Sequence, residues 1–293
     1  MGLIGENDMF IPIINNLLSQ IFFFVILIGA VGYLISLCNK LFYTLTGNAK
    51  AVCYATGFIG TPIHELSHAA MCVVFMHRID EMKLFQIGDD GTLGYVKHSY
   101  DEKNIYQKIG NYFISVAPVV LGGAVLLLAM SLLAPDMYKE FSEYIEDFAY
   151  LQSTGVGSEW LAYALVVLRG TFVAIISGIG NPETLWFLFI ILALCIAIHM
   201  NLSGQDIKVS LSALPMLIGV LAVVNFALGF ILPKVYAGFV SVMCTLGGYL
   251  SGMLMISLIL SVFALLVAAL IRGVILLVKA FPDIIKKIPI GRR

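Results

Sequence analysis

Long apolar runs alternate with short polar connections along most of the chain, and these runs predict its helices. A helix of about 20 apolar residues is long enough to cross the roughly 30 Å hydrocarbon core of a bilayer. The pattern predicts an all-α polytopic membrane protein with about six to seven transmembrane helices, forming a single membrane domain over residues 1–293. The expected spans are residues 18–37, 51–76, 109–133, 184–200, 210–232 and 235–279. The last run is too long for one straight crossing, so a break is expected at Gly247–Gly252.

One stretch, residues 82–98, has a different pattern. Two short β-prone runs, Met82–Ile87 and Thr92–His98, flank the turn sequence Gly88-Asp89-Asp90-Gly91. This arrangement predicts a β-hairpin directly after the second span. The hairpin is too short and polar to cross a bilayer, so it is expected at the membrane surface or in a protein-lined cavity. Two interpretations stay open: a strand edge that holds an extended peptide, and a simple connector.

Two further segments interrupt the pattern of spans. Residues 135–159 are acidic at their start and rich in small residues at their end, which predicts an extramembrane segment opening with an amphipathic helix. Residues 160–180 are apolar but contain Arg169. They are compatible with a span and with a helix in the membrane interface, and the pattern does not choose between these.

Composition supports a membrane protein and argues against some partners. Hydrophobic residues make up 60% of the 293 residues and charged residues only 12%, about half the usual share. The formal net charge is -1, without the basic stripe that nucleic-acid binding requires, so the expected surroundings are a lipid bilayer and no nucleic acid. The five cysteines are scattered without paired spacing, which predicts neither a disulfide framework nor a cysteine zinc site.

The candidate chemistry lies in the second span, in the sequence His64-Glu65-Leu66-Ser67-His68. Residues four apart share one face of a helix, so His64 and His68 can present two imidazoles to one metal ion. Glu65 is placed to accept a proton from a metal-bound water. Zinc suits such a pair because it binds histidine nitrogen readily and keeps a position open when only three protein ligands bind.

The motif has two other interpretations. Short HExxH matches occur by chance on the surfaces of soluble helices. Here the flanking residues are strongly apolar, and two histidines with a glutamate are costly in such surroundings unless they are paired or bound to a metal. A non-proteolytic metal-binding protein or transporter could use the same histidine pair. Glu65 argues against it, because a pure binding site needs no carboxylate beside its ligands.

A catalytic zinc needs a third protein ligand, and the chain offers few candidates. Asp206 and His199 lie near the end of a later span, in a short stretch that mixes polar and apolar residues. Glu183 lies at the beginning of that span, whereas His77 and His98 flank the hairpin in a polar context. Zinc accepts aspartate and histidine alike, so the chemistry alone leaves Asp206 and His199 as alternatives.

The HExxH motif in an apolar segment, the hairpin after it and a later segment ending in an aspartate resemble the site-2-protease family of intramembrane zinc metalloproteases. The resemblance implies a zinc ion held by His64, His68 and Asp206, with Glu65 as general base; His199 is the alternative third ligand. Ser203–Ile207 matches the family's second motif only at the aspartate and lacks its Asn-Pro and final Gly. Ala117-Pro118 is similar to the family's Gly-Pro element.

The same resemblance implies an activity. A member of this family would be a zinc metalloendopeptidase that hydrolyses peptide bonds of a transmembrane protein or peptide. Its expected location is the bacterial cytoplasmic membrane, as a multi-pass protein.

Overall fold

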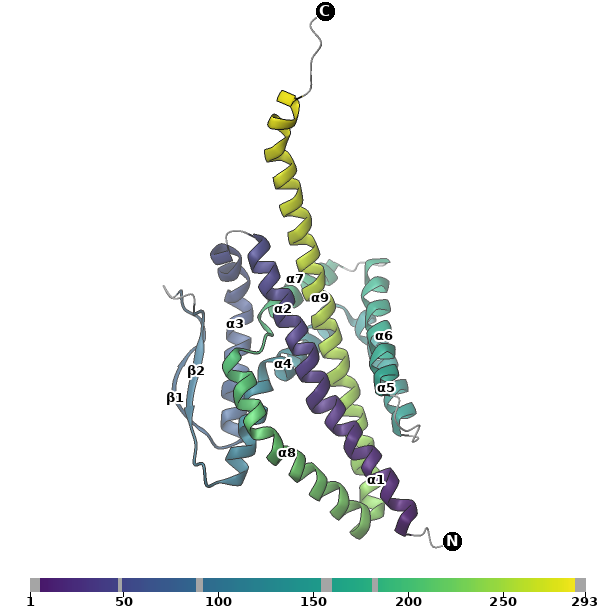
Figure 1. Ribbon diagram of the computed structural model, residues 1–293. Helices are drawn as coiled ribbons and strands as arrows, with labels where there is room; N and C mark the ends of the chain where they lie inside the picture. The colour runs from purple at the N-terminus through teal and green to yellow at the C-terminus, as the bar shows by residue number, and fades with distance from the viewer. Residues whose placement is uncertain (1–5, 47–48, 88–91, 154–159, 181–183, 288–293) are drawn as a thin grey trace, which may run out of the picture.

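The computed structural model describes residues 6–46, 49–87, 92–153, 160–180 and 184–287. These residues form a helical bundle with one two-stranded antiparallel sheet on its flank (Figure 1). The predicted all-α class and the predicted hairpin are therefore both confirmed.

The N-terminal helices run as one continuous rod. It consists of α1 (Glu6–Ile21), a π-helical turn η1 (Phe22–Leu27) and α2 (Ile28–Thr46). The predicted span at 18–37 lies within this rod, which is longer at both ends. The hydroxyl of Tyr112 donates a hydrogen bond to the Phe24 carbonyl inside the π-helical turn. This contact ties the turn to the middle of the bundle.

The motif lies on α3 (Ala49–Val74), which leads directly into the hairpin of β1 (Arg78–Lys83) and β2 (Tyr95–Ser99). The first strand starts and ends earlier than predicted, so residues 84–87 are not part of it. Nearly the whole of β1 is exposed, and most of its residues are charged. It therefore lacks the apolar and β-branched residues by which a strand is recognised in a sequence. The predicted turn, residues 88–91, lies outside the described residues.

The middle of the chain forms α4 (Ile105–Leu133), α5 (Pro135–Ser153) and α6 (Trp160–Gly180). The predicted amphipathic helix in the acidic segment is present as α5. Its apolar face, with Met137, Phe141 and Ile145, is buried on α9 and its neighbours. The small-residue stretch at 154–159 lies outside the described residues.

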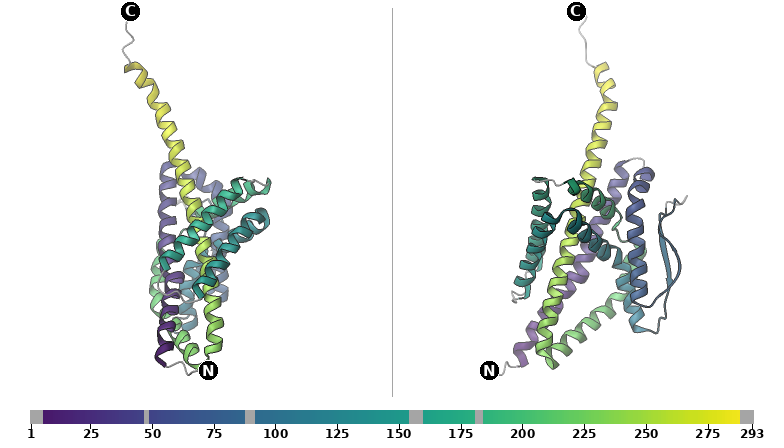
Figure 2. Two further views of the ribbon diagram at one scale, coloured as in Figure 1. Left: turned by 90° about the vertical axis from the view of Figure 1, so that its right-hand side faces the viewer. Right: turned by 180° about the vertical axis from the view of Figure 1, so that it is seen from behind.

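The last three helices are α7 (Thr184–His199), α8 (Gly204–Ile231) and α9 (Pro233–Lys287). The expected break at Gly247–Gly252 was wrong, because α9 is continuous and extends well beyond the bundle (Figures 1 and 2). A Cβ on Gly252 would collide with the Phe141 ring. This glycine therefore permits close packing rather than a bend.

Four helices in the described chain are long and apolar enough to cross a membrane: Phe10–Thr46, Ile105–Leu133, Gly204–Ile231 and Pro233–Ala280. They indicate a membrane protein. The motif helix α3 is not among them, because its histidines, glutamate and proline lower its mean hydropathy. Helices α6 and α7 contain shorter apolar stretches, Leu165–Ile179 and Leu185–His199.

The hydrophobic core lies where α2, α4, α7 and α9 meet. Its fully buried members include Ile35, Leu126, Met200 and Leu254. Helix α3 packs on one side of this group, against α4 and α7. The core thereby fixes α4 and α7 on either side of the HExxH face.

Candidate metal centre

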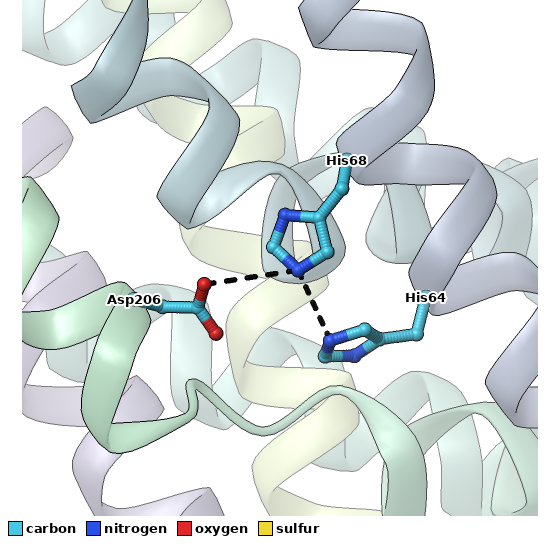
Figure 3. Close-up of side chains that lie close together, drawn as sticks. All are labelled: His64, His68 and Asp206. Carbon is cyan, nitrogen blue, oxygen red and sulfur yellow. Dashed lines mark hydrogen bonds and ion pairs between the residues drawn. The ribbon is translucent and has the colours of Figure 1, made fainter. Parts of the chain in front are cut away.

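Two helices far apart in the sequence bring three ligand-type side chains together (Figure 3). His64 and His68 lie one turn apart on α3, and their Nε2 atoms are 3.2 Å apart. Asp206 comes from the first turn of α8, with Oδ1 3.8 Å from His68 Nε2. One potential ligand atom from each residue lies within 4.8 Å of the other two. Of the predicted ligands, the structure therefore brings His64, His68 and Asp206 to one point.

Asp206 is held in place by the start of its own helix. Ser203 is the N-cap of α8, and its Oγ accepts the Asp206 backbone N–H at 3.1 Å. In return, Asp206 Oδ2 accepts the Ser203 backbone N–H at 2.8 Å. This capping box keeps Oδ2 occupied and leaves Oδ1 directed at the histidines. The Ser-x-x-Asp spacing could have shown that α8 starts at 204 rather than 210.

The proton positions on both histidines follow from their partners. His64 Nδ1 lies 2.8 Å from the His199 carbonyl oxygen, and His68 Nδ1 lies 2.7 Å from the Ile114 carbonyl oxygen. A carbonyl can only accept, so each Nδ1 carries the proton and each neutral ring presents a bare Nε2 lone pair. Two lone pairs and a carboxylate oxygen thus converge. A hydrogen bond between the two Nε2 atoms would require a proton on one of them and therefore a charged ring. A metal ion can accept both lone pairs while both rings stay neutral.

The spacing suits a tetrahedral ion. Two nitrogens bound at about 2.0–2.1 Å in a tetrahedral site lie about 3.3 Å apart. The observed Nε2–Nε2 distance is 3.2 Å. To complete the set, the Asp206 oxygen would need to approach His68 by roughly half an ångström from its 3.8 Å distance and to move closer to His64 as well, since the three ligand atoms lie within 4.8 Å of one another. The histidine pair therefore already has the spacing of a tetrahedral site, and a shift of the Asp206 side chain would complete it.

Glu65 lies beside this cluster and borders the same space. Its side chain is only 7% exposed, yet it lines a cavity of about 590 Å³ together with His64, His68 and Asp206. A second cavity of about 350 Å³ also reaches Glu65 and His64, from the side of Thr61. Glu65 therefore stands between two spaces, each large enough for water and part of a peptide.

The hairpin closes over this glutamate at Gly94, just before β2. A Cβ on Gly94 would lie 2.8 Å from Glu65 Cγ, 2.8 Å from Thr61 Cγ2 and 2.9 Å from the Lys83 carbonyl oxygen. No other residue type leaves room for so close an approach. The cavity wall beyond it follows the strand, since Tyr95, Val96, Lys97 and His98 all line the larger cavity.

His199, the alternative third ligand, is not brought to the cluster. Its Nε2 lies 3.0 Å from Thr56 Oγ1, while its backbone carbonyl accepts from His64. The residue thus reaches the site through its backbone. No ion pair joins Asp206 to Lys208 in the described part of the chain, so a surface pair between these two residues does not account for the position of the aspartate. Glu183 lies outside the described residues.

Sequence reasoning missed several groups around the centre. The two carbonyls that orient the histidines carry no sequence signal, because any residue supplies a carbonyl. Asn111 and Ser115 of α4 line the cavity and were not predicted as part of the site. His98 was set aside as a ligand, although the alternation along β2 could have placed it on the strand face with Val96 and Tyr100.

Comparison with known proteins adds nothing to this site. No protein-family model, no curated protein and no solved structure matches the chain. The functional argument therefore rests on the geometry of the site itself.

Proposed function

We propose that the protein is a zinc-dependent intramembrane endopeptidase of the site-2-protease type. The observation that carries the proposal is the convergence of His64 Nε2, His68 Nε2 and Asp206 Oδ1, with Glu65 on the wall of the same cavity. Both imidazoles are already in the tautomer that a metal requires. A ligand set of two histidines and one carboxylate, with space for water, is typical of hydrolytic zinc sites.

The residues of the chain divide the chemistry among them. A zinc ion held by His64, His68 and Asp206 would polarise a peptide carbonyl and make a bound water more acidic. Glu65 accepts a proton from the attacking water and passes it to the nitrogen of the departing amine. Asn111 and Ser115 add polar groups to the cavity wall, which helps water reach a site within the bundle.

The substrate that suits this cavity is a membrane protein segment in extended form. Peptide carbonyls in a helix are already hydrogen-bonded, so a transmembrane helix must unwind before it is cut. The strand β2 borders the larger cavity and is one of only two strands in the described sheet, so one of its edges has no strand partner. An unwound segment could pair with that edge beside Glu65.

The proposal also sets the arrangement in the membrane. Helices α3, α6 and α7 would cross together with the four long apolar helices, giving seven spans, and α5 would lie at the surface with its charged face in water. The expected location is the bacterial cytoplasmic membrane. Buried polar side chains on α3 are tolerated in such a span because they face protein and a cavity rather than lipid.

The test compares the native protein with Glu65→Gln and with Glu143→Gln, an exposed glutamate of α5 away from the cavity that serves as the matched control. Metal analysis of each purified protein should find one zinc ion per chain in all three, since the ligands are untouched. Comparison of membrane proteomes from cells producing each form should find new protein termini that depend on Glu65 alone. Removing a positioned general base should slow cleavage about 10²–10⁴-fold.

Two results would contradict the proposal. Loss of zinc from Glu65→Gln would make Glu65 a ligand and exclude its role as a base. Equal sets of new termini in native and Glu65→Gln cells, with zinc bound in both, would favour a binding or transport role for the metal.

A further inference from the structure

A second pair of histidines lies at the edge of the cavity, on the hairpin side. His77 follows α3 and is 5% exposed, and its Nδ1 lies 3.0 Å from His98 Nδ1 on β2. His77 Nε2 lies 2.8 Å from the Gln107 carbonyl oxygen at the start of α4. His98 lines the larger cavity together with His68 and Asp206. The metal centre does not use this pair.

The hydrogen-bond chain determines which nitrogen of His98 is bare. The Gln107 carbonyl can only accept, so His77 carries its proton on Nε2 and presents a bare Nδ1. His98 must therefore donate from its own Nδ1. Its Nε2 is left with a lone pair, and among the described residues nothing donates a hydrogen bond to it. Burial, followed by the neighbouring His77, lowers the pKa of His98, which favours this neutral form.

The face of the hairpin decides where His98 points. Tyr95 and Lys97 both contact Glu81, and Ser99 contacts Asp80, so these side chains share the outer face. Successive residues of a strand point to opposite sides. Val96 and His98 consequently face inward, toward α3 and α4.

The ring of His77, which hydrogen-bonds to His98, is also held firmly. Tyr100 stacks on His77 with ring centroids 4.9 Å apart and an interplanar angle of 16°. Gln107 donates from Nε2 to the Met76 carbonyl at 2.8 Å, which fastens the root of the hairpin to α4. A hydrogen-bond acceptor fixed by two layers of partners is preorganised to bind a donor.

We propose that His98 is a substrate-binding residue whose Nε2 accepts a backbone N–H from a peptide segment lying in the cavity. The inference rests on the proposed function and names its substrate contact. An extended peptide offers free backbone N–H groups, whereas an intact helix does not. His77 acts through His98 as a positioning residue.

The experiment measures binding rather than turnover. The probes are acetohydroxamate, which has no peptide, and a series of short peptide hydroxamates, each methylated at a different backbone nitrogen. Affinities are compared for zinc-loaded native protein, His98→Leu, His98→Gln and Ser99→Ala. The last variant changes the neighbouring residue on the outer face and is the matched control. Gln offers an oxygen at about the position of the lost Nε2.

We expect methylation at one particular nitrogen to weaken binding to the native protein and Ser99→Ala by about two- to tenfold, the range of one hydrogen bond. In His98→Leu that difference should vanish, and in His98→Gln it should persist in part. The same methylation penalty in His98→Leu as in the native protein would overturn the inference and leave the proposed function standing. Failure of acetohydroxamate to bind any form would overturn both.

Discussion

Each histidine ring of the motif is oriented by a backbone carbonyl from a different helix. The residues whose side chains would bind the metal are therefore distinct from those that only orient the ligands. The His199 carbonyl comes from the end of α7 and the Ile114 carbonyl from α4. The bare nitrogens of His64 and His68 therefore depend on three helices staying in register. Substitutions that leave these carbonyls in place should affect the centre far less than loss of a ligand atom.

Asp206→Asn and His199→Phe test this separation. Asn still accepts the Ser203 backbone N–H, so the cap of α8 survives while the ligand charge is lost. Zinc affinity should fall by more than the about 10–100-fold typical of outer-sphere changes. His199→Phe loses only the contact with Thr56 and should stay close to native occupancy.

Zinc content after titration with a chelator measures both effects, with thermal unfolding as the check on folding. Full occupancy in Asp206→Asn together with loss in His199→Phe would reverse the assignment of the third ligand.

At the scale of elements, the hairpin is positioned by its contact with α3 at Gly94. Gly94→Ala places a methyl group where Glu65, Thr61 and the Lys83 carbonyl already lie. The hairpin must move outward, at a cost of about 1–3 kcal/mol in folding stability. We expect slower cleavage with the zinc content unchanged, because no ligand is touched.

Gly204→Ala is the matched control, since a Cβ there meets no atom within 4 Å. Cleavage rate, zinc content and thermal unfolding are measured for both variants. Native activity in a folded Gly94→Ala protein would show that the contact has no functional weight.

The outer face of the hairpin should respond to acid. Lys97, with its Nζ 2.8 Å from Glu81 Oε2, and then Tyr95 lower the pKa of Glu81 below its usual 4.5. Because the folded-state pKa is the lower one, this pairing stabilises the hairpin above the unfolded-state pKa. The stabilisation is lost as the pH falls through the folded-state pKa.

Hydrogen-exchange protection of the β1 and β2 amides should therefore drop as the pH falls from neutral to below the usual glutamate pKa of 4.5 and through the lower folded-state pKa. Glu81→Gln should start with lower protection and change less over this range. An equal change in both proteins would assign the acid response to other groups.

Helices and strands could be predicted from the sequence where a local pattern of residues marks them. The HExxH pair, the amphipathic α5 and the presence of a hairpin all follow from spacing, periodicity or turn residues. The strand β1 could not be placed, since its exposed Arg78–Lys83 sequence is recognisable only once its partner strand is known. Asp206 was named from a family resemblance, and its geometry depends on how α8 packs across the bundle.

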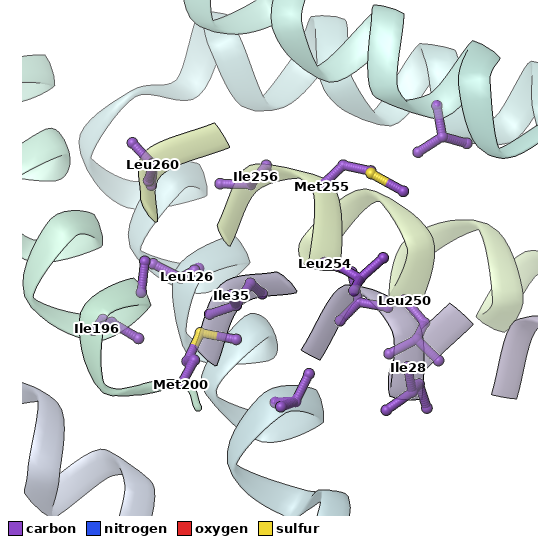
Figure 4. Close-up of a cluster of buried hydrophobic side chains, with 14 of the residues drawn as sticks. Ile28, Ile35, Leu126, Ile196, Met200, Leu250, Leu254, Met255, Ile256 and Leu260 are labelled. Carbon is purple, nitrogen blue, oxygen red and sulfur yellow. The ribbon is translucent and has the colours of Figure 1, made fainter. Parts of the chain in front are cut away.

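At the scale of the whole molecule, the core connects the metal centre to distant helices. Met200 directly follows His199 and lies among Ile35, Leu126 and Leu254 (Figure 4). Ser257 of α9 places its Oγ 3.4 Å from the Met200 sulfur. The carbonyl that orients His64 is thereby anchored in the same packing that joins α2, α4 and α9. Such long-range packing leaves no local mark in the sequence, which is why the break expected in α9 was wrong.

A buried polar network joins the N-terminal rod to α8 at the opposite end from Asp206. Gln20 Nε2 donates to Asn225 Oδ1 at 3.1 Å, and Asn225 Nδ2 donates back to Gln20 Oε1 at 2.8 Å. Tyr236 of α9 also donates to Asn225 Oδ1, at 3.2 Å. All these groups are satisfied, so the network can fix the placement of three helices.

Gln20→Leu or Asn225→Leu alone should destabilise the protein by about 1–3 kcal/mol, because each leaves buried polar groups unpaired. The double variant should cost less than the sum of the two. Thermal unfolding in detergent measures this as a double-mutant cycle. Additive losses would mean that the two amides stabilise the protein independently.

The π-helical turn at Phe22–Leu27 makes chain length matter in the N-terminal rod. Such a turn holds one residue more than a regular helix needs over the same rise. Deleting a single residue within this turn would let it close into a regular α-helix, and Gln20 would still face Asn225. Deleting one residue from the regular helix α2 would instead rotate everything before the deletion by about 100° and turn Gln20 away from Asn225, although every side chain of the network would still be present. In this rod, the π-helical turn is therefore a place where the chain tolerates a one-residue deletion without losing the register of its helices.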